Sequence, residues 1–77
     1  MIKFDLRKAL LDFQARTGIK MSYEDLSGDT DISVETLKSI ATRENYNATF
    51  RVVSTISESL GINPIEYLSW NRDEQNK

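Results

Sequence analysis

The stretch SYEDLSGDTDISVETLKSIA, residues 22–41, decides the fold because it predicts two short helices separated by a tight turn. Ser22 and Ser33 stand where a side-chain oxygen can cap the N-terminus of each helix. An apolar residue precedes each serine and another follows four positions later, as in a hydrophobic staple. These staple residues are Met21, Leu26, Ile32 and Leu37. The intervening GDTD, residues 28–31, is dense in turn-forming residues, so the second helix is held out from the body of the domain.

An amphipathic helix is predicted upstream of this stretch. Its apolar residues recur at spacings of three and four, and charged residues take the opposite side. Asp5 can cap this helix, and Gly18 supplies a left-handed stop. The apolar side consists of Leu6, Ala9, Leu10 and Phe13, and the charged side of Arg7, Lys8, Asp12 and Arg16.

Two further helices are predicted downstream. The third helix should end near Arg43, because the following ENYN has no apolar period. Asn47 can cap a fourth helix that ends at Gly61, and the Asn-Pro pair at 63–64 can open a short fifth helix over 65–70. The apolar residues of these helices are Phe50, Val53, Ile56 and Leu60 in the fourth and Tyr67 and Leu68 in the fifth.

The length predicts one domain, and the five predicted helices make it a compact all-α domain at residues 1–70, followed by a polar tail at 71–77. At this length, folding buries little more than ~60% of the chain's surface, so the core is modest. Without cysteine, histidine or a glycine-rich phosphate loop, no active site, metal site or cofactor site is expected. Charges interrupt the apolar residues at the N-terminus, which excludes a signal peptide or membrane span there and favours the cytoplasm.

Taken in order, residues 6–68 resemble the Cro/C1-type helix-turn-helix family of small DNA-binding regulators. RTGIKMSYEDL, from residue 16, is similar to the end of helix 1 leading into helix 2, and DISVETLKSI, from residue 31, is similar to the turn and recognition helix. ATFRVVSTISESLGINPIEYL, residues 48–68, follows the last two helices without a gap. Leu60, Gly61 and Ile62 stand where the family commonly has LGV, which is the most specific match.

Three residues depart from the family pattern. Ser27 replaces the usual alanine or glycine at the close crossing of helices 2 and 3, and it is small enough to serve. Asp31 replaces the glycine of the turn. Aspartate tolerates the left-handed conformation better than most residues, so the turn is expected to survive at modest strain. Thr30 stands where an apolar residue is usual.

The resemblance implies that the third helix enters the major groove by its first turn. Glu35 can accept a hydrogen bond from the N4 amino group of cytosine, and Val34 can contact a thymine methyl group. Glu35 can equally serve only to complement the helix dipole, and the sequence leaves both interpretations open. The candidate base-reading residues are Ser33, Val34, Glu35, Lys38 and Ser39.

Contacts to phosphate are expected from cations and amides around that edge. The candidate phosphate-binding residues are Lys20, Ser22, Tyr23, Arg43, Asn45, Tyr46, Asn47 and Arg51. Arg16 is expected to add a further positive charge nearby. Tyr23 and Tyr46 are expected to be exposed there, whereas the other aromatic residues are assigned to the core or an interface. These are Phe4, Phe13, Phe50, Tyr67 and Trp70, the last as a dimer contact.

Two functions remain open at this point. The first is a sequence-specific DNA-binding transcriptional regulator, a small prokaryotic or phage repressor that binds a two-fold operator in double-stranded DNA as a homodimer. The alternative is a protein-interaction module, an antitoxin or adaptor, that keeps the fold with little DNA binding. The net charge of -2 and the pI near 5.0 favour the alternative, or else weak non-specific DNA binding that needs two subunits. No membrane contact or small-molecule ligand is expected.

Overall fold

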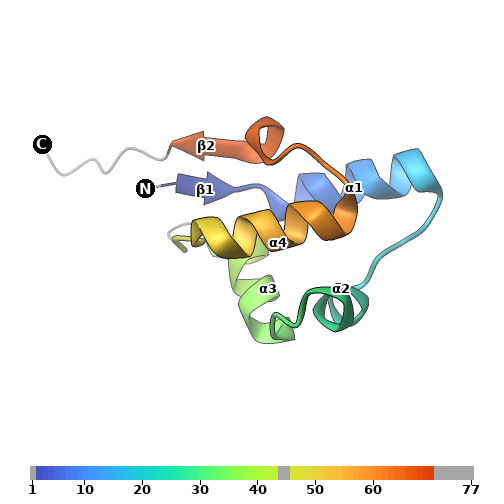
Figure 1. Ribbon diagram of the computed structural model, residues 1–77, viewed down its shortest axis with the longest axis horizontal. Helices are drawn as coiled ribbons and strands as arrows, with labels where there is room; N and C mark the ends of the chain where they lie inside the picture. The colour runs from blue at the N-terminus through green and yellow to red at the C-terminus, as the bar shows by residue number, and fades with distance from the viewer. Residues whose placement is uncertain (1, 44–45, 71–77) are drawn as a thin grey trace, which may run out of the picture.

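The computed structural model describes residues 2–43 and 46–70 of the 77. In Figure 1, α2 and α3 lie on one side of α4, and α1 and the sheet lie on the other. The elements are β1 (Ile2–Phe4), α1 (Leu6–Thr17), α2 (Tyr23–Thr30), α3 (Val34–Thr42), α4 (Phe50–Leu60), a 3-10 helix (Pro64–Tyr67) and β2 (Leu68–Trp70). No helix in the described part is long and apolar enough to cross a membrane.

The prediction of a mostly helical domain is confirmed, but the all-α class and the five helices are not. The expected fifth helix at 65–70 is instead a single 3-10 turn that leads into β2. This strand pairs antiparallel with β1, with Ile2 opposite Trp70 and Phe4 opposite Leu68. Strands of three residues are too short to show a two-residue alternation, and their pairing joins the two ends of the domain. The expected polar tail at 71–77 lies outside the described residues.

The helix boundaries follow the local capping residues. Asp5 begins α1, and its Oδ1 accepts a hydrogen bond from the Lys8 N–H at 3.2 Å. Gly18 and Gly61 end α1 and α4 in the left-handed conformation, as expected. The cap of α4 is Thr49 and not Asn47, so this helix begins two residues later than its predicted cap implies.

The core forms where the four helices and the inner end of the sheet meet. Leu6, Leu26 and Leu37 are fully buried, one from each of the first three helices, and Ile56 joins them from α4. Phe4 of β1 is buried as well, and its ring meets Tyr67 edge to face with centroids 6.4 Å apart. The core therefore ties the two termini of the domain to its helices.

Two expectations about aromatic residues are corrected. The helical period predicts that Phe50 belongs to the apolar line of α4, but it is the first residue of that helix and is 75% exposed. Ala48, just before the helix, is buried near its beginning instead. Tyr23 and Tyr46 are half-buried against the core and not exposed, so their rings contribute mainly to packing.

Candidate nucleic-acid interface

The N-terminus of α2 is closed by a reciprocal capping box. The Asp25 N–H donates to Ser22 Oγ at 3.0 Å, and the Ser22 N–H donates to Asp25 Oδ2 at 3.3 Å. These bonds satisfy the first and last of the four amides that an α-helix leaves without partners inside the helix. The amides of Tyr23 and Glu24 are the two others, so any anion at this helix end would meet them.

The turn between α2 and α3 is tight and fully hydrogen-bonded at Asp31 and Thr30, the two residues that depart from the expected pattern. Asp31 adopts the left-handed conformation with φ 63°, and its N–H donates to Ser27 O at 2.8 Å. The buried Thr30 hydroxyl donates to Leu26 O at 2.7 Å and accepts from the Ile32 N–H at 3.3 Å. Because this hydroxyl is paired on both sides, threonine can occupy a site that usually takes an apolar residue.

α3 divides its residues between the core and an outer edge. Leu37 and Ile40 face the core, whereas Glu35 and Lys38 are exposed. The N-cap of α3 is Ser33, as the sequence predicts. The charged residues of the first two turns of α3 therefore point away from the body of the domain. They are accessible to a DNA duplex that approaches this edge.

The five candidate base-reading residues are not equally available. Ser33 is exposed, but its Oγ accepts from the Thr36 N–H at 3.1 Å and donates to Thr36 Oγ1 at 2.9 Å. Val34 and Ser39 are half-buried, so each offers only part of its surface. Glu35 and Lys38 thus remain the most accessible of the set.

Arg7 joins the expected cations although the sequence prediction left it out. A hollow of about 400 Å³ between α1 and α2 is lined by Arg7, Lys20 and the α2 N-terminus at Ser22. The amphipathic pattern correctly places Arg7 on the polar side of α1. It does not reveal which other element that side approaches, because the packing of α1 beside α2 is a tertiary feature.

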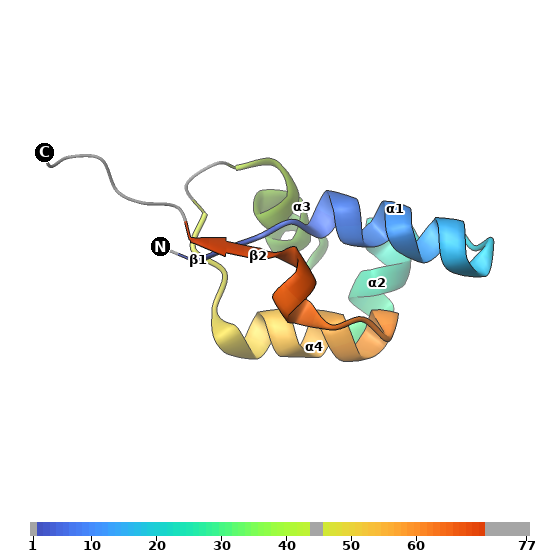
Figure 2. The ribbon, with the colours of Figure 1, turned by 90° about the horizontal axis from the view of Figure 1, so that it is seen from above.

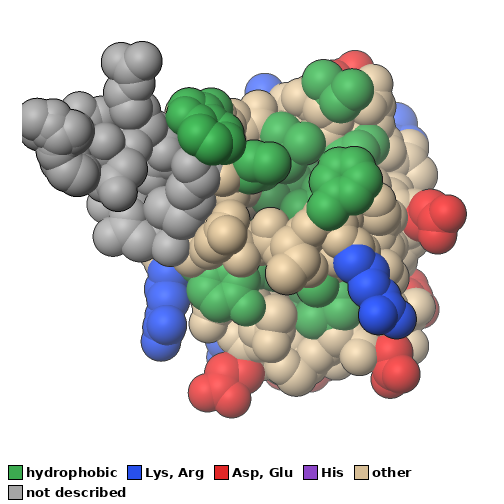
Figure 3. All heavy atoms as spheres, turned by 60° about the vertical axis from the view of Figure 1, so that its left-hand side comes forward, with side chains coloured by type: hydrophobic (Ala, Val, Ile, Leu, Met, Phe, Trp, Pro, Cys, Tyr) green, Lys and Arg blue, Asp and Glu red, His purple; other side chains and the backbone are tan. Residues whose placement is uncertain are grey.

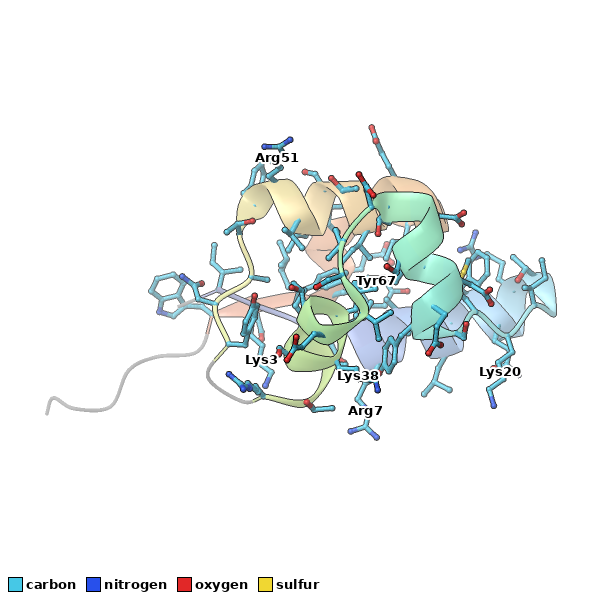
Figure 4. All side chains as sticks on the ribbon, turned by 90° about the horizontal axis from the view of Figure 1, so that it is seen from below. Lys3, Arg7, Lys20, Lys38, Arg51 and Tyr67 are labelled. Carbon is cyan, nitrogen blue, oxygen red and sulfur yellow. The ribbon has the colours of Figure 1, made fainter. Side chains whose placement is uncertain are left out.

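Figure 4 shows how the cations are distributed around α3. Lys3, Arg7, Lys38 and Lys20 lie along one side of the view, and we call these four residues the cationic row. Arg51 lies on the opposite side of the molecule, so the structure does not bring it together with them. The cationic row passes α3 and reaches the N-terminus of α2.

The remaining candidates for phosphate binding are dispersed. Arg43 ends α3 as its C-cap and is exposed, and Asn47 is exposed in the segment before α4. Tyr46 is half-buried, and Asn45 lies outside the described residues. Arg43, Tyr46 and Asn47 lie beyond the C-terminal end of α3, at the opposite end of the helix from Ser33.

Arg16 does not add to the charge near α3, contrary to expectation. Its Nη2 donates to Leu60 O at 3.0 Å, at the C-terminus of α4, and its guanidinium lies 5.8 Å from the centre of the Phe13 ring. A cation at the C-terminal end of a helix meets the negative end of its dipole. Arg16 therefore holds α1 against α4.

The exposed edge of α3 is therefore flanked by the cationic row and by the amides of Tyr23 and Glu24 at the N-terminus of α2. The major groove of B-DNA admits an α-helix, and phosphates on either side of the groove attract cations and helix N-termini. Glu24 and Asp25 at the head of α2 oppose this attraction. The capping box holds one of these two carboxylates, that of Asp25, against the backbone amide of Ser22.

Comparison with known families agrees with this geometry. A family model described as a Cro/C1-type HTH DNA-binding domain matches residues 12–73. The match includes α2, α3 and α4 entirely, and therefore the turn at Asp31. A search of curated proteins finds no match to the chain.

Proposed function

The chain belongs to the Cro/C1-type helix-turn-helix DNA-binding domain family, and we propose on that premise that it is a sequence-specific transcriptional regulator. It acts in the cytoplasm as a small prokaryotic or phage repressor. It binds a two-fold operator as a homodimer, so that each subunit places α3 in one half-site. Occupying the promoter then blocks polymerase by steric exclusion.

One observation carries this proposal. Lys38 lies both on the exposed edge of α3 and in the cationic row that continues to the N-terminus of α2. A helix in the major groove has a sugar-phosphate strand on each side, so it needs base-directed and phosphate-directed groups on adjoining surfaces. The placement of Lys38 supports such an arrangement, with Lys20 and Arg7 toward one phosphate strand.

Glu35 has a specific part in this proposal. Its side chain is exposed in the first turn of α3, where family members approach base edges. A carboxylate there accepts a hydrogen bond from cytosine N4 and repels the acceptor groups of guanine, and such a contact is worth about 1–3 kcal/mol of discrimination. Glu35 therefore contributes specificity and reduces affinity for unmatched DNA.

The proposal is tested by binding of the full chain to DNA from upstream of its own gene. If a dimer neutralises about six phosphates, affinity falls roughly 10³-fold between about 50 and 200 mM salt. Lys38→Glu and Arg7→Glu should each abolish the discrete complex at the higher salt. Arg51→Glu is the matched control, with the same charge change on the opposite side of the molecule, and should retain it.

Two outcomes would contradict the proposal at different levels. Absence of a complex with any genomic fragment at low salt excludes a DNA-binding function. If Lys38→Glu and Arg51→Glu lose the same amount of DNA affinity, the DNA-binding function still stands. The cationic row is then excluded as the DNA-binding surface. Circular dichroism of each variant verifies that the helices are retained.

The alternative function, a protein-interaction module such as an antitoxin or adaptor, is favoured by one feature. Glu24 and Asp25 stand at the head of α2, close to the proposed phosphate contact, in a chain of net charge -2. Replacing both by glutamine separates the functions. A DNA-binding protein should bind more tightly after this change, because two repulsive charges are removed, whereas a module that uses these carboxylates to hold a basic partner should lose that partner.

A further inference from the structure

The hollow between α1 and α2 has an apolar inner wall that the proposed phosphate contacts do not use. Figures 1 and 2 both place α2 beside α1, at a distance from the outer end of the sheet. The volume of the hollow, about 400 Å³, lies within the range of about 300–1,000 Å³ found for small-molecule sites in proteins. Its apolar wall consists of Leu10 and Leu11 of α1 and of Met21 and Tyr23 around the beginning of α2.

These four side chains form a surface that the core leaves open to solvent. Leu10, Met21 and Tyr23 are half-buried and pack against the core, so their outer sides line the hollow. Leu11 stands beside them and is 66% exposed. Removing such surface from water is favourable for any ligand that brings an apolar body of matching size.

Two cations stand at the same hollow. Arg7 comes from α1 and Lys20 from the segment before α2, and both are exposed. Figure 4 shows the two side chains on the same side of the molecule. Within the described part of the chain, neither is paired with a carboxylate. Glu24 also lines the hollow, so two positive charges against one negative leave a single excess positive charge.

We propose that the hollow binds a small apolar monocarboxylate, that is, an organic acid with one anionic head and an apolar body. The body covers the wall of four apolar side chains, and the head meets Arg7 and Lys20. A guanidinium can hold a carboxylate by two parallel hydrogen bonds. The single excess positive charge matches one negative charge, and Glu24 disfavours a second. The sequence alone predicts no such ligand, because no local motif joins α1 to the beginning of α2.

The position of the hollow gives the ligand a regulatory effect, and this step rests on the proposed DNA-binding function. Arg7 and Lys20 belong to the cationic row, where they are assigned to one phosphate strand of the operator. A carboxylate bound to the same two cations competes with that strand. A ligand that binds the free protein better than the DNA complex lowers the affinity for DNA by linkage. The monocarboxylate therefore acts as an inducer that releases the repressor.

A series of straight-chain acids tests the site on the full chain. Butanoate, hexanoate, octanoate and decanoate are titrated at equal ionic strength while the backbone amide resonances are followed by NMR. Each added methylene should strengthen binding roughly fourfold until the hollow is full, and the gain should then stop. The amides that shift should be those of residues 7–14 and 20–24.

Two results of this titration would overturn the proposal. The first is an absence of amide shifts with octanoate and decanoate up to about 10 mM. The second is a set of shifts spread over all exposed apolar residues, with affinity that grows at every chain length. That pattern is nonspecific partitioning of the acid onto the protein surface.

The contribution of the charged head is measured with octylammonium, which has the same body and the opposite charge. It should bind at least about tenfold more weakly than octanoate. Arg7→Gln should lower octanoate affinity by about the same factor, whereas Arg51→Gln, the matched control on the opposite side of the molecule, should retain it. Equal binding of the two probes, or equal losses in the two variants, overturns the proposal.

The contribution of the apolar wall is measured with Leu11→Ser, which removes an exposed side chain and leaves the core intact. This variant should weaken octanoate binding severalfold. Ile65→Ser is the matched control, because Ile65 is 74% exposed and stands in the 3-10 helix, outside the hollow. Circular dichroism verifies that both variants keep their helices. Equal octanoate affinity in the two variants overturns the apolar wall as the binding surface.

Release from DNA separates this proposal from the proposed function. If both hold, octanoate releases the unmodified chain from its operator, and Leu11→Ser, which changes no cation, needs severalfold more octanoate for the same release. If octanoate binds in the hollow and the chain binds no DNA, the ligand site stands and the DNA-binding proposal fails. If DNA binds but octanoate shifts no amide around the hollow, the ligand site fails alone. Binding of octanoate without release of DNA overturns the inducer role.

Discussion

The α2–α3 unit buries its apolar side chains and exposes a polar edge, whereas the outer end of the sheet and the beginning of α4 leave an aromatic surface in water (Figure 3). Leu37 in α3 has no exposed surface, while Phe50 and Trp70 expose 75% and 70% of theirs. The first surface suits a hydrated, charged ligand such as DNA, and the second suits another protein surface. The difference separates the polar face proposed for DNA binding from an apolar face of opposite character on the same small domain.

The largest expected effect compares the two regions directly. Leu37→Ala removes a fully buried side chain and should lower the free energy of unfolding by about 2–5 kcal/mol. Trp70→Ala should cost under about 1 kcal/mol in dilute solution, because it removes mainly a cross-strand contact with Ile2. Urea unfolding followed by circular dichroism measures both. If both substitutions lowered the free energy of unfolding equally, Trp70 would belong to the core, and the contrast between the two regions would be wrong.

The turn at Asp31 gives the next effect. Because its φ is 63°, Asp31→Val should destabilise the domain by about 1–2 kcal/mol, and Asp31→Gly should stabilise it by about 0.5–1 kcal/mol. Asp29→Gly, inside α2, is the control and should destabilise it instead. Thermal unfolding distinguishes the signs. A destabilising Asp31→Gly would show that the aspartate side chain holds the turn.

A buried hydroxyl in α4 gives an effect of about 1 kcal/mol. Ser57 is buried, and its Oγ has no hydrogen-bond partner among the described residues. Ser57→Ala should therefore stabilise the domain by about that amount, more than the same change at the exposed Ser54 of the same helix. If Ser57→Ala and Ser54→Ala raise the free energy of unfolding equally, the higher helix propensity of alanine explains the whole effect. This measurement bears on both regions of the molecule, because α4 packs between the α2–α3 unit and the sheet.

The smallest effect concerns the contact that ties the 3-10 helix to α1. Tyr67 donates a hydrogen bond from its hydroxyl to Asp12 Oδ2 at 2.7 Å, and this bond raises the pKa of the phenol above its ordinary 10.0. Protonated Tyr67 therefore stabilises the fold below pH 10.0, and this contribution is lost as pH rises through the raised pKa. Tyr67→Phe should lower the urea midpoint at about pH 8 and lower it less at about pH 11.

Asp12→Asn provides the control for that measurement. It changes the acceptor of the hydrogen bond, which is the main cause of the raised pKa of Tyr67, and removes the charge of Asp12, which is a smaller cause, so it should reduce the same alkaline dependence. A gap between Tyr67→Phe and the unmodified chain that widens above pH 10 would have the opposite sign and would exclude this role for the hydrogen bond.

The sequence predicted the parts of the structure that are determined by residues three or four positions apart. The caps at Asp5, Ser22 and Ser33 are confirmed, and so are the left-handed stop at Gly18 and the left-handed Asp31. Each depends on a bond between near neighbours in the chain, so the residue types at these spacings favour it, although the same reasoning selected Asn47 for α4, where the cap is Thr49. The inward positions of α3 follow from the helical period for the same reason.

Features that depend on distant parts of the chain could not be predicted in this way. The sheet joins residues 2–4 to residues 68–70, and neither segment is long enough to show a strand pattern alone. Phe50 fits the apolar period of α4, yet the first turn of that helix extends past the core. Arg7 and Arg16 share the polar side of α1, but tertiary packing brings one beside α2 and the other to the C-terminus of α4.

The pairing of β1 with β2 also sets the order of events during protein synthesis. β1 leaves the ribosome first, and its hydrogen-bonding partner is not translated until Trp70 has been added. At about 5–20 residues per second, the nascent chain spends some seconds with this strand unpaired. Phe4, which the finished domain buries, lacks its edge-to-face contact with Tyr67 until that residue has been added. The sheet is therefore completed late, after the helices have had time to form.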